Sequence, residues 1–232
     1  MTRGPCPPAP GGRDRAARLA CATAWGAGAR RYGEPVRVIG GTARGRRLRA
    51  PRLAGLRPTS DRVKEAIFDV LMHLGAVEDA TVVDLFAGSG ALGIEALSRG
   101  ARSVTFVDAD RAAVDAVTAN LEATGLAGDR RATVVRAEAL GFAADPGHAF
   151  DLALVDPPYA FDRWTELLGR LRAGTVVLES ARPIELGERF ELHRQYRYGT
   201  TLVTVANAPE SLPEVEGEGS PGGEGSGREA RS

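Results

Sequence analysis

The stretch TVVDLFAGSGALG, residues 81–93, decides the fold. Its first six residues are mostly apolar, which is typical of a buried strand, and its end opens a helix-length segment. Between the two, Gly88, Gly90 and Gly93 stand in a G-x-G-x-x-G spacing. Glycines let a backbone pass close to a ligand and leave the N–H groups of the next helix pointing at it. This strand–loop–helix unit predicts a nucleotide-like cofactor at the edge of a sheet.

Short apolar runs alternate with helix-length segments on either side of this unit. We expect further strands at 103–108, 132–137, 151–156 and 175–180, and helices at 91–100, 111–125 and around 163–172. Near-continuous apolar strands separated by helices predict a mostly parallel sheet with both faces covered. Residues 190–206 have the pattern of an antiparallel hairpin. An α/β fold with a mostly parallel seven-stranded sheet and a C-terminal hairpin resembles the Rossmann-like class I methyltransferase fold.

Composition predicts one folded domain between two disordered ends. Residues 1–35 are rich in Pro, Gly, Ala and Arg, and residues 209–232 contain almost no apolar side chains. Such segments cannot bury enough apolar surface to fold. The expected domain is 36–208, in which 36–75 is a basic N-terminal element and 76–208 is the catalytic core.

The basic N-terminal element predicts an anionic partner. The net charge of the 232-residue chain is zero, but nine Arg or Lys residues stand between Val36 and Lys64 against one acid, Asp61. The pattern predicts a small hairpin at 36–48 and a helix at 58–71 with Thr59 or Ser60 as its N-cap. A basic block on a neutral chain indicates that one region alone contacts an anion.

Other functional classes find little support in the sequence. The two cysteines, Cys6 and Cys21, both precede the expected domain, and the three histidines match no metal-ligand spacing. No apolar run approaches the length of a membrane span. We therefore expect a monomeric cytoplasmic enzyme that uses neither a metal nor a membrane.

Two acids next to the glycine loop favour S-adenosylmethionine over NAD. Asp108 follows Gly88 by 20 residues and ends the next strand, where a carboxylate can accept hydrogen bonds from a ribose diol. Asp84 directly precedes the loop, where it would repel a pyrophosphate. A carboxylate there suits the ammonium group of a cationic amino-acid moiety instead.

The tetrapeptide Asp156-Pro157-Pro158-Tyr159 indicates the chemistry. It ends the strand at 151–156, at the sheet edge where open α/β folds bind ligands. An exocyclic amino nitrogen is a poor nucleophile, because its lone pair is delocalised into the ring. The Asp156 carboxylate and the Pro157 carbonyl could accept its two hydrogens and free that lone pair, and the two prolines stiffen the loop. Tyr159 offers a ring face on which an extruded base can stack.

With these motifs, the N-terminal element resembles a known family. The pieces RVIGG (37–41), RGRRL (44–48) and LRPTSDRVKE (56–65), followed by FAGSGALGIEALSRGA and VDPPY, are similar to the bacterial enzymes that methylate the N2 amino group of guanine 966 in 16S ribosomal RNA. The resemblance covers about residues 36–205.

The resemblance implies a role for each matching position. The target guanine would be held by Asp156, Pro157, Pro158 and Tyr159. The cofactor would be held by Thr59, Asp84, Phe86, Gly88, Ser89, Gly90, Asp108, Ala109, Glu138 and Ala139. The RNA of the 30S subunit would be contacted by Arg44, Arg46, Arg47, Arg49, Arg57 and Arg62.

Several alternatives share part of this pattern. DNA adenine-N6 methyltransferases also use Asp-Pro-Pro-Tyr but need a separate target-recognition segment. Protein glutamine-N5 methyltransferases usually carry Asn in place of Asp156. An NAD-dependent oxidoreductase would leave the Asp-Pro-Pro-Tyr motif unexplained, and a non-enzymatic RNA-binding module would leave the glycine loop unused.

Overall fold

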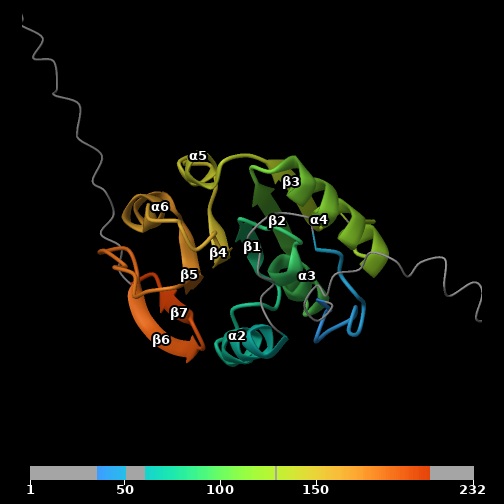
Figure 1. Ribbon diagram of the computed structural model, residues 1–232, viewed down its shortest axis with the longest axis horizontal. Helices are drawn as coiled ribbons and strands as arrows, with labels where there is room; N and C mark the ends of the chain where they lie inside the picture. The colour runs from blue at the N-terminus through green and yellow to red at the C-terminus, as the bar shows by residue number, and fades with distance from the viewer. Residues whose placement is uncertain (1–35, 51–60, 129, 210–232) are drawn as a thin grey trace, which may run out of the picture. The chain divides into compact units, whose positions relative to one another are not determined.

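A seven-stranded, mostly parallel sheet forms the centre of the domain. The computed structural model describes residues 36–50, 61–128 and 130–209. The strand order across the sheet is β3-β2-β1-β4-β5-β7-β6, and β7 alone runs in the direction opposite to the other six strands (Figure 1). The strands are β1 (Thr81–Leu85), β2 (Ser103–Asp108), β3 (Ala132–Arg136), β4 (Phe150–Val155), β5 (Ala173–Ser180), β6 (Glu191–Tyr198) and β7 (Thr201–Asn207).

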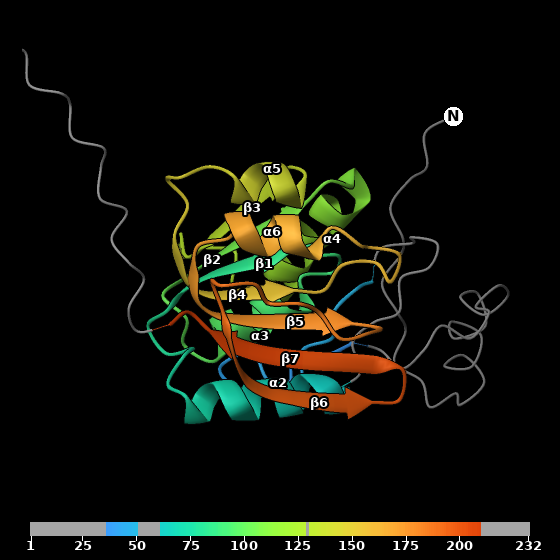
Figure 2. The same ribbon diagram turned by 90° about the vertical axis from the view of Figure 1, so that its left-hand side faces the viewer.

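Helices cover both faces of this sheet (Figure 2). One face packs against α2 (Asp61–His73), α3 (Ala91–Ser98) and α4 (Arg111–Thr124). The other face packs against α5 (Ala139–Ala143) and α6 (Trp164–Arg170). Successive strand residues point to opposite faces, so within β1 Val82 joins the first core and Val83 the second. A strand buried on both sides must be apolar throughout, which explains the continuous apolar runs in the sequence.

The predicted architecture is confirmed, with three differences in detail. The helix expected at 58–71 spans Asp61–His73, while Thr59 and Ser60 lie outside the described residues. The expected N-terminal hairpin pairs through one antiparallel bridge, Arg37 with Arg47. The five-residue α5 was not predicted, because so short a run of small and apolar residues carries no helical periodicity.

The N-terminal hairpin is held against α3 by one buried acid. Both oxygens of the Glu95 carboxylate accept backbone N–H groups, from Ile39 at 2.8 Å and from Gly40 at 2.7 Å. Glu95 is fully buried and is paired with Arg99 at 2.8 Å and with Lys64 at 3.7 Å. A carboxylate needs such partners to be tolerated out of water.

Close packing against α3 explains the two glycines of this hairpin. Gly41 has a φ of +73°, and a Cβ there would meet the Ser98 carbonyl oxygen at 1.8 Å. Ser98 also donates a hydrogen bond to the Gly40 carbonyl at 2.6 Å. The hairpin therefore lies on the end of α3 and keeps a fixed position relative to the glycine loop at the start of that helix.

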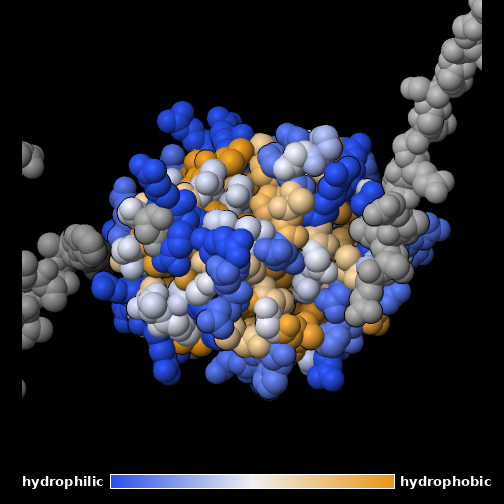
Figure 3. Space-filling model, turned by 180° about the vertical axis from the view of Figure 1, so that it is seen from behind, coloured by the Kyte–Doolittle hydropathy of each residue, from blue (hydrophilic) through white to orange (hydrophobic). Residues whose placement is uncertain are grey.

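The outer surface is mixed in character. The face shown in Figure 3 has hydrophilic and hydrophobic residues interspersed. Within residues 36–50, 61–128 and 130–209, no helix is long and apolar enough to cross a membrane. The same residues contain no group of three or more His, Cys, Asp or Glu side chains placed to hold a metal ion.

Candidate active site

The glycine loop turns sharply between β1 and α3. Phe86, Gly88 and Gly90 all have positive φ, at 60°, 55° and 75°, and the Gly90 N–H donates to the Ala87 carbonyl at 2.6 Å. A positive φ is costly for a side chain like that of Phe86, so the surrounding structure must hold it there. Phe86 does make such contacts, because its ring meets the Phe161 ring edge-on at 5.2 Å.

The third glycine of the motif allows α3 to pack closely on the sheet. A Cβ at Gly93 would lie 2.4 Å from the Phe106 ring and 2.9 Å from an oxygen of Asp84. Close helix–strand packing is the expected role of this position in the G-x-G-x-x-G spacing.

Asp84 lies behind the loop and does not line the cavity described below. It is 2% exposed, and its Oδ2 accepts the Gly93 N–H at 2.9 Å. Burial raises the pKa of this carboxyl well above its ordinary value; the Gly93 hydrogen bond opposes that shift, and the charges of Asp156 and Asp108 add to it. The geometry thus gives Asp84 a role in holding α3 to β1, and its predicted contact with a cofactor ammonium stays a prediction.

Asp108 connects the loop to the end of β2. Its Oδ2 accepts the Gly88 N–H at 2.9 Å, and its Oδ1 accepts the Asp110 N–H at 2.9 Å. Each carboxylate oxygen can accept more than one hydrogen bond, so Asp108 can still accept from the hydroxyls of a ribose. Its position at the carboxyl edge of the sheet is the one that the sequence predicted.

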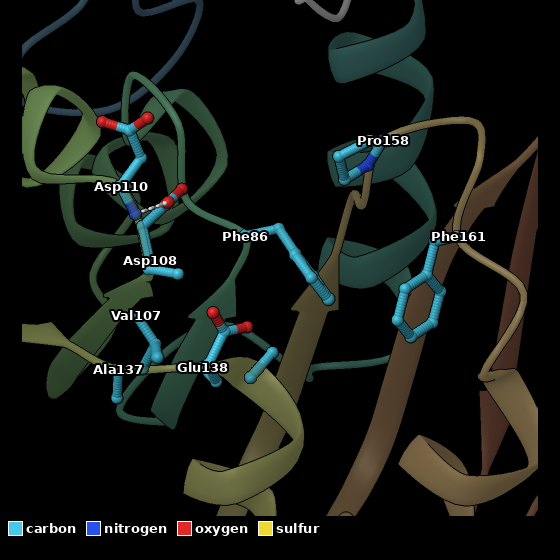
Figure 4. A pocket seen from close by; sticks show the side chains of 10 residues that line it. Phe86, Val107, Asp108, Asp110, Ala137, Glu138, Pro158 and Phe161 are labelled. Atoms are coloured by element: carbon cyan, nitrogen blue, oxygen red, sulfur yellow. Dashed lines mark hydrogen bonds between the residues drawn. The ribbon is translucent and has the colours of Figure 1, made fainter.

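A cavity of about 310 Å³ opens beside Asp108. Six of the predicted site residues line it, and so do four others. The predicted ones are Phe86, Asp108, Ala109, Glu138, Ala139 and Pro158, and the others are Val107, Asp110, Ala137 and Phe161. In Figure 4 the side chains of Asp108 and Glu138 approach it from one side, and those of Phe86 and Phe161 from the other. Apolar walls for a flat ring, with carboxylates at one end, fit a nucleoside such as the adenosyl group of S-adenosylmethionine.

The Asp-Pro-Pro-Tyr segment borders the same cavity. It follows β4 directly, and the Asp156 N–H lies 3.5 Å from the Leu85 carbonyl at the end of β1. Pro157 is buried, while Pro158 lines the cavity. Tyr159 is 52% exposed, and its hydroxyl is 2.9 Å from the Thr201 hydroxyl in β7. An exposed ring beside a nucleoside-sized cavity is free to stack on a second base.

The arginines of the N-terminal hairpin are available to an anion. Arg44, Arg46, Arg47 and Arg49 are exposed, and among the described residues their guanidinium groups have no carboxylate partner. Arg62, on α2, is also exposed. Two other predicted site residues, Arg57 and Thr59, lie outside the described residues. Lys64, which the sequence counts within the basic block, is fully buried, so its charge is not part of this surface.

Sequence reasoning missed the residues that assemble the site. Asn120 is buried in α4, and its amide group bonds to the backbone of both Arg49 and Ser89. Phe161 packs against the core and also lines the cavity, whereas its neighbour Trp164 is 8% exposed and belongs to the core. Of these residues only Phe161 has a signal in the sequence, because it follows Tyr159 by two residues.

Comparison with known proteins gives relatives that are named as ribosomal RNA methyltransferases. Over 124 residues the chain is 47% identical to Ribosomal RNA small subunit methyltransferase D of Escherichia coli (strain K12), and the match covers 53% of this chain and 60% of that protein. Over 183 residues it is 38% identical to the Putative rRNA methyltransferase YlbH of Bacillus subtilis (strain 168), covering 73% of this chain and 97% of the relative.

A solved structure confirms the class of fold. The structure described as a putative methyltransferase yhhF from Escherichia coli superimposes with a TM-score of 0.66 at 36% identity, covering 75% of this chain and 98% of its own. The fold is therefore that of class I methyltransferases. The model of the family described as Conserved hypothetical protein 95 matches residues 36–207. Because that match includes the hairpin, the glycine loop and the Asp-Pro-Pro-Tyr segment, this chain belongs to the Conserved hypothetical protein 95 family.

Proposed function

We propose that this protein transfers a methyl group from S-adenosylmethionine to the N2 amino group of guanine 966 in 16S ribosomal RNA. The observation that carries the proposal is the position of Asp156-Pro157-Pro158-Tyr159 at the rim of a nucleoside-sized cavity. Pro158 lines that cavity and Tyr159 faces outward. One short segment can thus meet a cofactor on one side and a base on the other.

The residues around the cavity fit the cofactor. S-adenosylmethionine supplies a methyl group that is already activated for transfer when it binds. Asp108 would accept hydrogen bonds from the ribose hydroxyls and Glu138 would contact the adenine, while Phe86 and Phe161 line the cavity with apolar surface. Because the methyl group is already activated, the chain has mainly to position the nucleophile.

The residues of β4 and its extension prepare that nucleophile. The Asp156 carboxylate and the Pro157 carbonyl accept the two hydrogens of the amino group, and Asp156 or water takes the proton that is released. Fixed acceptors in a site without bulk water need no reorganisation during the reaction. Tyr159 stacks on the target base after it leaves its own stack.

An RNA substrate is supported by the hairpin arginines and by the names of the relatives. Both relatives described above are named as ribosomal RNA methyltransferases. The four hairpin arginines lack carboxylate partners within the part of the chain that the structure describes, as expected of phosphate ligands. We propose that the substrate is the 30S subunit in the cytoplasm and that the enzyme acts as a monomer.

One experiment separates this function from its alternatives. The protein is incubated with labelled S-adenosylmethionine and, in parallel, with unmodified 30S subunits, naked 16S RNA, double-stranded DNA or a release factor. We expect label in 16S RNA. Label in DNA would indicate an adenine-N6 enzyme and label in the release factor a glutamine-N5 enzyme, and either result would overturn the proposal.

A further inference from the structure

The outermost strand of the sheet carries an aromatic and basic row of side chains. β6 is the last strand in the order, so among the described strands it has a neighbour, β7, on one side only. Arg194, Tyr196 and Tyr198 are opposite Val205, Val203 and Thr201 of β7. Residues two apart in a strand share a face, so these three side chains stand in a row, here called the β6 ladder.

Contacts within the β6 ladder are those of a stacking surface. The Arg194 guanidinium carbon lies 5.9 Å from the centre of the Tyr196 ring. The Tyr196 and Tyr198 rings are 6.3 Å apart at an interplanar angle of 30°. Tyr198 packs partly against the core, whereas Tyr196 is half-buried and Arg194 is exposed. The row therefore has an anchored end and an open end.

The anchored end lies at the active-site edge of the sheet. β6 is antiparallel to β7, which is antiparallel to β5, so β6 ends at the same edge as the parallel strands. Figure 2 shows the arrowheads of β5 and β6 pointing the same way. Thr201 faces Tyr198 across the hairpin and is hydrogen-bonded to the Tyr159 hydroxyl. The β6 ladder thus leads to the ring on which the proposed target base stacks.

The charge and chemistry of the row select one kind of partner. In the described part of the chain the Arg194 guanidinium donates a hydrogen bond to the Tyr196 hydroxyl at 3.3 Å and has no carboxylate partner; the one acid of the strand, Glu191, lies three residues before Arg194, at the end away from Tyr198. Arg197 adds a positive charge on the other face of the strand. Aromatic rings beside unpaired arginines are the surface on which single-stranded nucleic acids stack their bases. An apolar protein partner would leave these charges unsatisfied.

We propose that the β6 ladder binds the single-stranded nucleotides adjacent to the target base, with Tyr196 stacking on a flanking base and Arg194 facing its phosphate. This inference rests on the proposed function, because it takes the substrate to be RNA. It identifies a second RNA-binding surface, across the site from the hairpin arginines, which would help to keep the target nucleotide extruded.

The test measures RNA binding by the full-length chain, independently of catalysis. Fluorescence anisotropy follows a labelled single-stranded RNA of about ten nucleotides, within the usual site size. Tyr196→Ala should weaken binding by about 5- to 150-fold, the equivalent of one lost base stack. Tyr196→Phe should bind as the wild type does. Arg194→Gln should reduce the slope of log affinity against log salt by about 0.7.

Matched controls distinguish stacking from a loss of structure. Leu192→Ala truncates an exposed apolar side chain, 58% exposed, on the same strand and should leave RNA affinity unchanged. Equal losses in Leu192→Ala and Tyr196→Ala, or no loss in Tyr196→Ala, would overturn the proposal. If the wild type methylates 16S RNA but Tyr196→Ala binds RNA normally, only the proposal for the β6 ladder is overturned. If the wild type methylates DNA or protein instead, the proposed function itself is overturned.

Discussion

The side-chain amide of Asn120 donates a hydrogen bond to the carbonyl of Ser89 at 2.8 Å. The same amide group donates to the Arg49 carbonyl at 2.9 Å and accepts the Arg49 N–H at 2.8 Å. One fully buried side chain of α4 therefore joins the glycine loop to the end of the arginine hairpin. Asn120 thereby fixes the position of the glycine loop relative to the proposed RNA-binding element.

Removing this connection should destabilise the domain. Asn120→Ala leaves the Arg49 and Ser89 backbone groups without their partner in a site that water reaches poorly. We expect the free energy of unfolding in urea to fall by at least about 1–3 kcal/mol. Thr118→Ala, which removes an exposed hydroxyl bonded to Val114 on the same helix, is the control and should change stability by less than about 0.5 kcal/mol. Equal effects in the two variants would show that the connection contributes nothing.

The raised pKa of Asp84 should make stability depend on pH. A carboxyl with a higher pKa when folded binds its proton more tightly in the folded state. Its stabilising contribution is complete below its unfolded pKa of about 3.8 and is lost as pH rises through the folded-state pKa. Asp84→Asn does not titrate and keeps an acceptor for Gly93. Between about pH 4 and neutrality, the wild type should therefore lose stability relative to this variant.

Asp79 provides a control of opposite sign. Its hydrogen bond and ion pair with Arg102 lower the pKa of Asp79, so its contribution is lost as pH falls. Urea unfolding should show the two opposite trends in different windows: the wild type loses stability relative to Asp84→Asn as pH rises above about 4, and it loses stability relative to Asp79→Asn as pH falls below about 4. Parallel curves for wild type and Asp84→Asn would refute the account of Asp84. Separately, a large loss of S-adenosylmethionine affinity in Asp84→Asn would support the ammonium contact predicted from the sequence.

Asp108 is expected to act on cofactor binding more than on the chemical step. The proposed contacts with a ribose would be the same before and during methyl transfer, so Asp108→Ala should raise the KM for S-adenosylmethionine more than it lowers kcat. Asp108→Asn keeps an acceptor for the Gly88 N–H and should be affected less. Calorimetry that finds the Kd for the cofactor unchanged in Asp108→Ala would exclude this residue from the ribose site.

The hairpin arginines should govern the salt dependence of RNA binding. Replacing Arg44, Arg46 and Arg47 by Gln should reduce the slope of log affinity against log salt by roughly 0.7–0.9 for each lost phosphate contact, with cofactor affinity unaffected. Arg111→Gln is a suitable control, because Arg111 is also exposed but is paired with Asp115 on α4. A triple variant with the wild-type slope would mean that these arginines do not contact phosphate.

The sequence predicted the sheet and the position of the chemistry, because both depend on local patterns. Continuous apolar runs such as TVVDLF indicate buried parallel strands, and a motif at a strand end lies at a known edge of the sheet. The contacts that assemble the site are not local. Glu95 bonds to Gly40 across 55 positions, and Asn120 to Arg49 across 71. In the sequence, Glu95 and Asn120 cannot be distinguished from polar residues on a protein surface, because their partners are far away along the chain.

Lys64 shows that a charged residue can also be assigned to the surface wrongly from the sequence. In the sequence it belongs to a basic block, and that block predicted phosphate contacts. In the structure it is buried beside Glu95 and donates to the Arg37 carbonyl, and burial lowers the pKa of its ammonium group. A charge count does not tell a solvated lysine from one that fixes a hairpin in place, because burial depends on tertiary packing.

The most direct test of the account is the amount of N2-methylguanosine formed at position 966 of 16S RNA in a single turnover on unmodified 30S subunits. We expect the wild type to form this nucleoside there. Asp156→Ala should form it on the order of 100-fold more slowly while binding S-adenosylmethionine normally, because it lacks one preorganised acceptor for the amino group. A different methylated nucleoside, a different position, or a normal rate in Asp156→Ala would contradict the account.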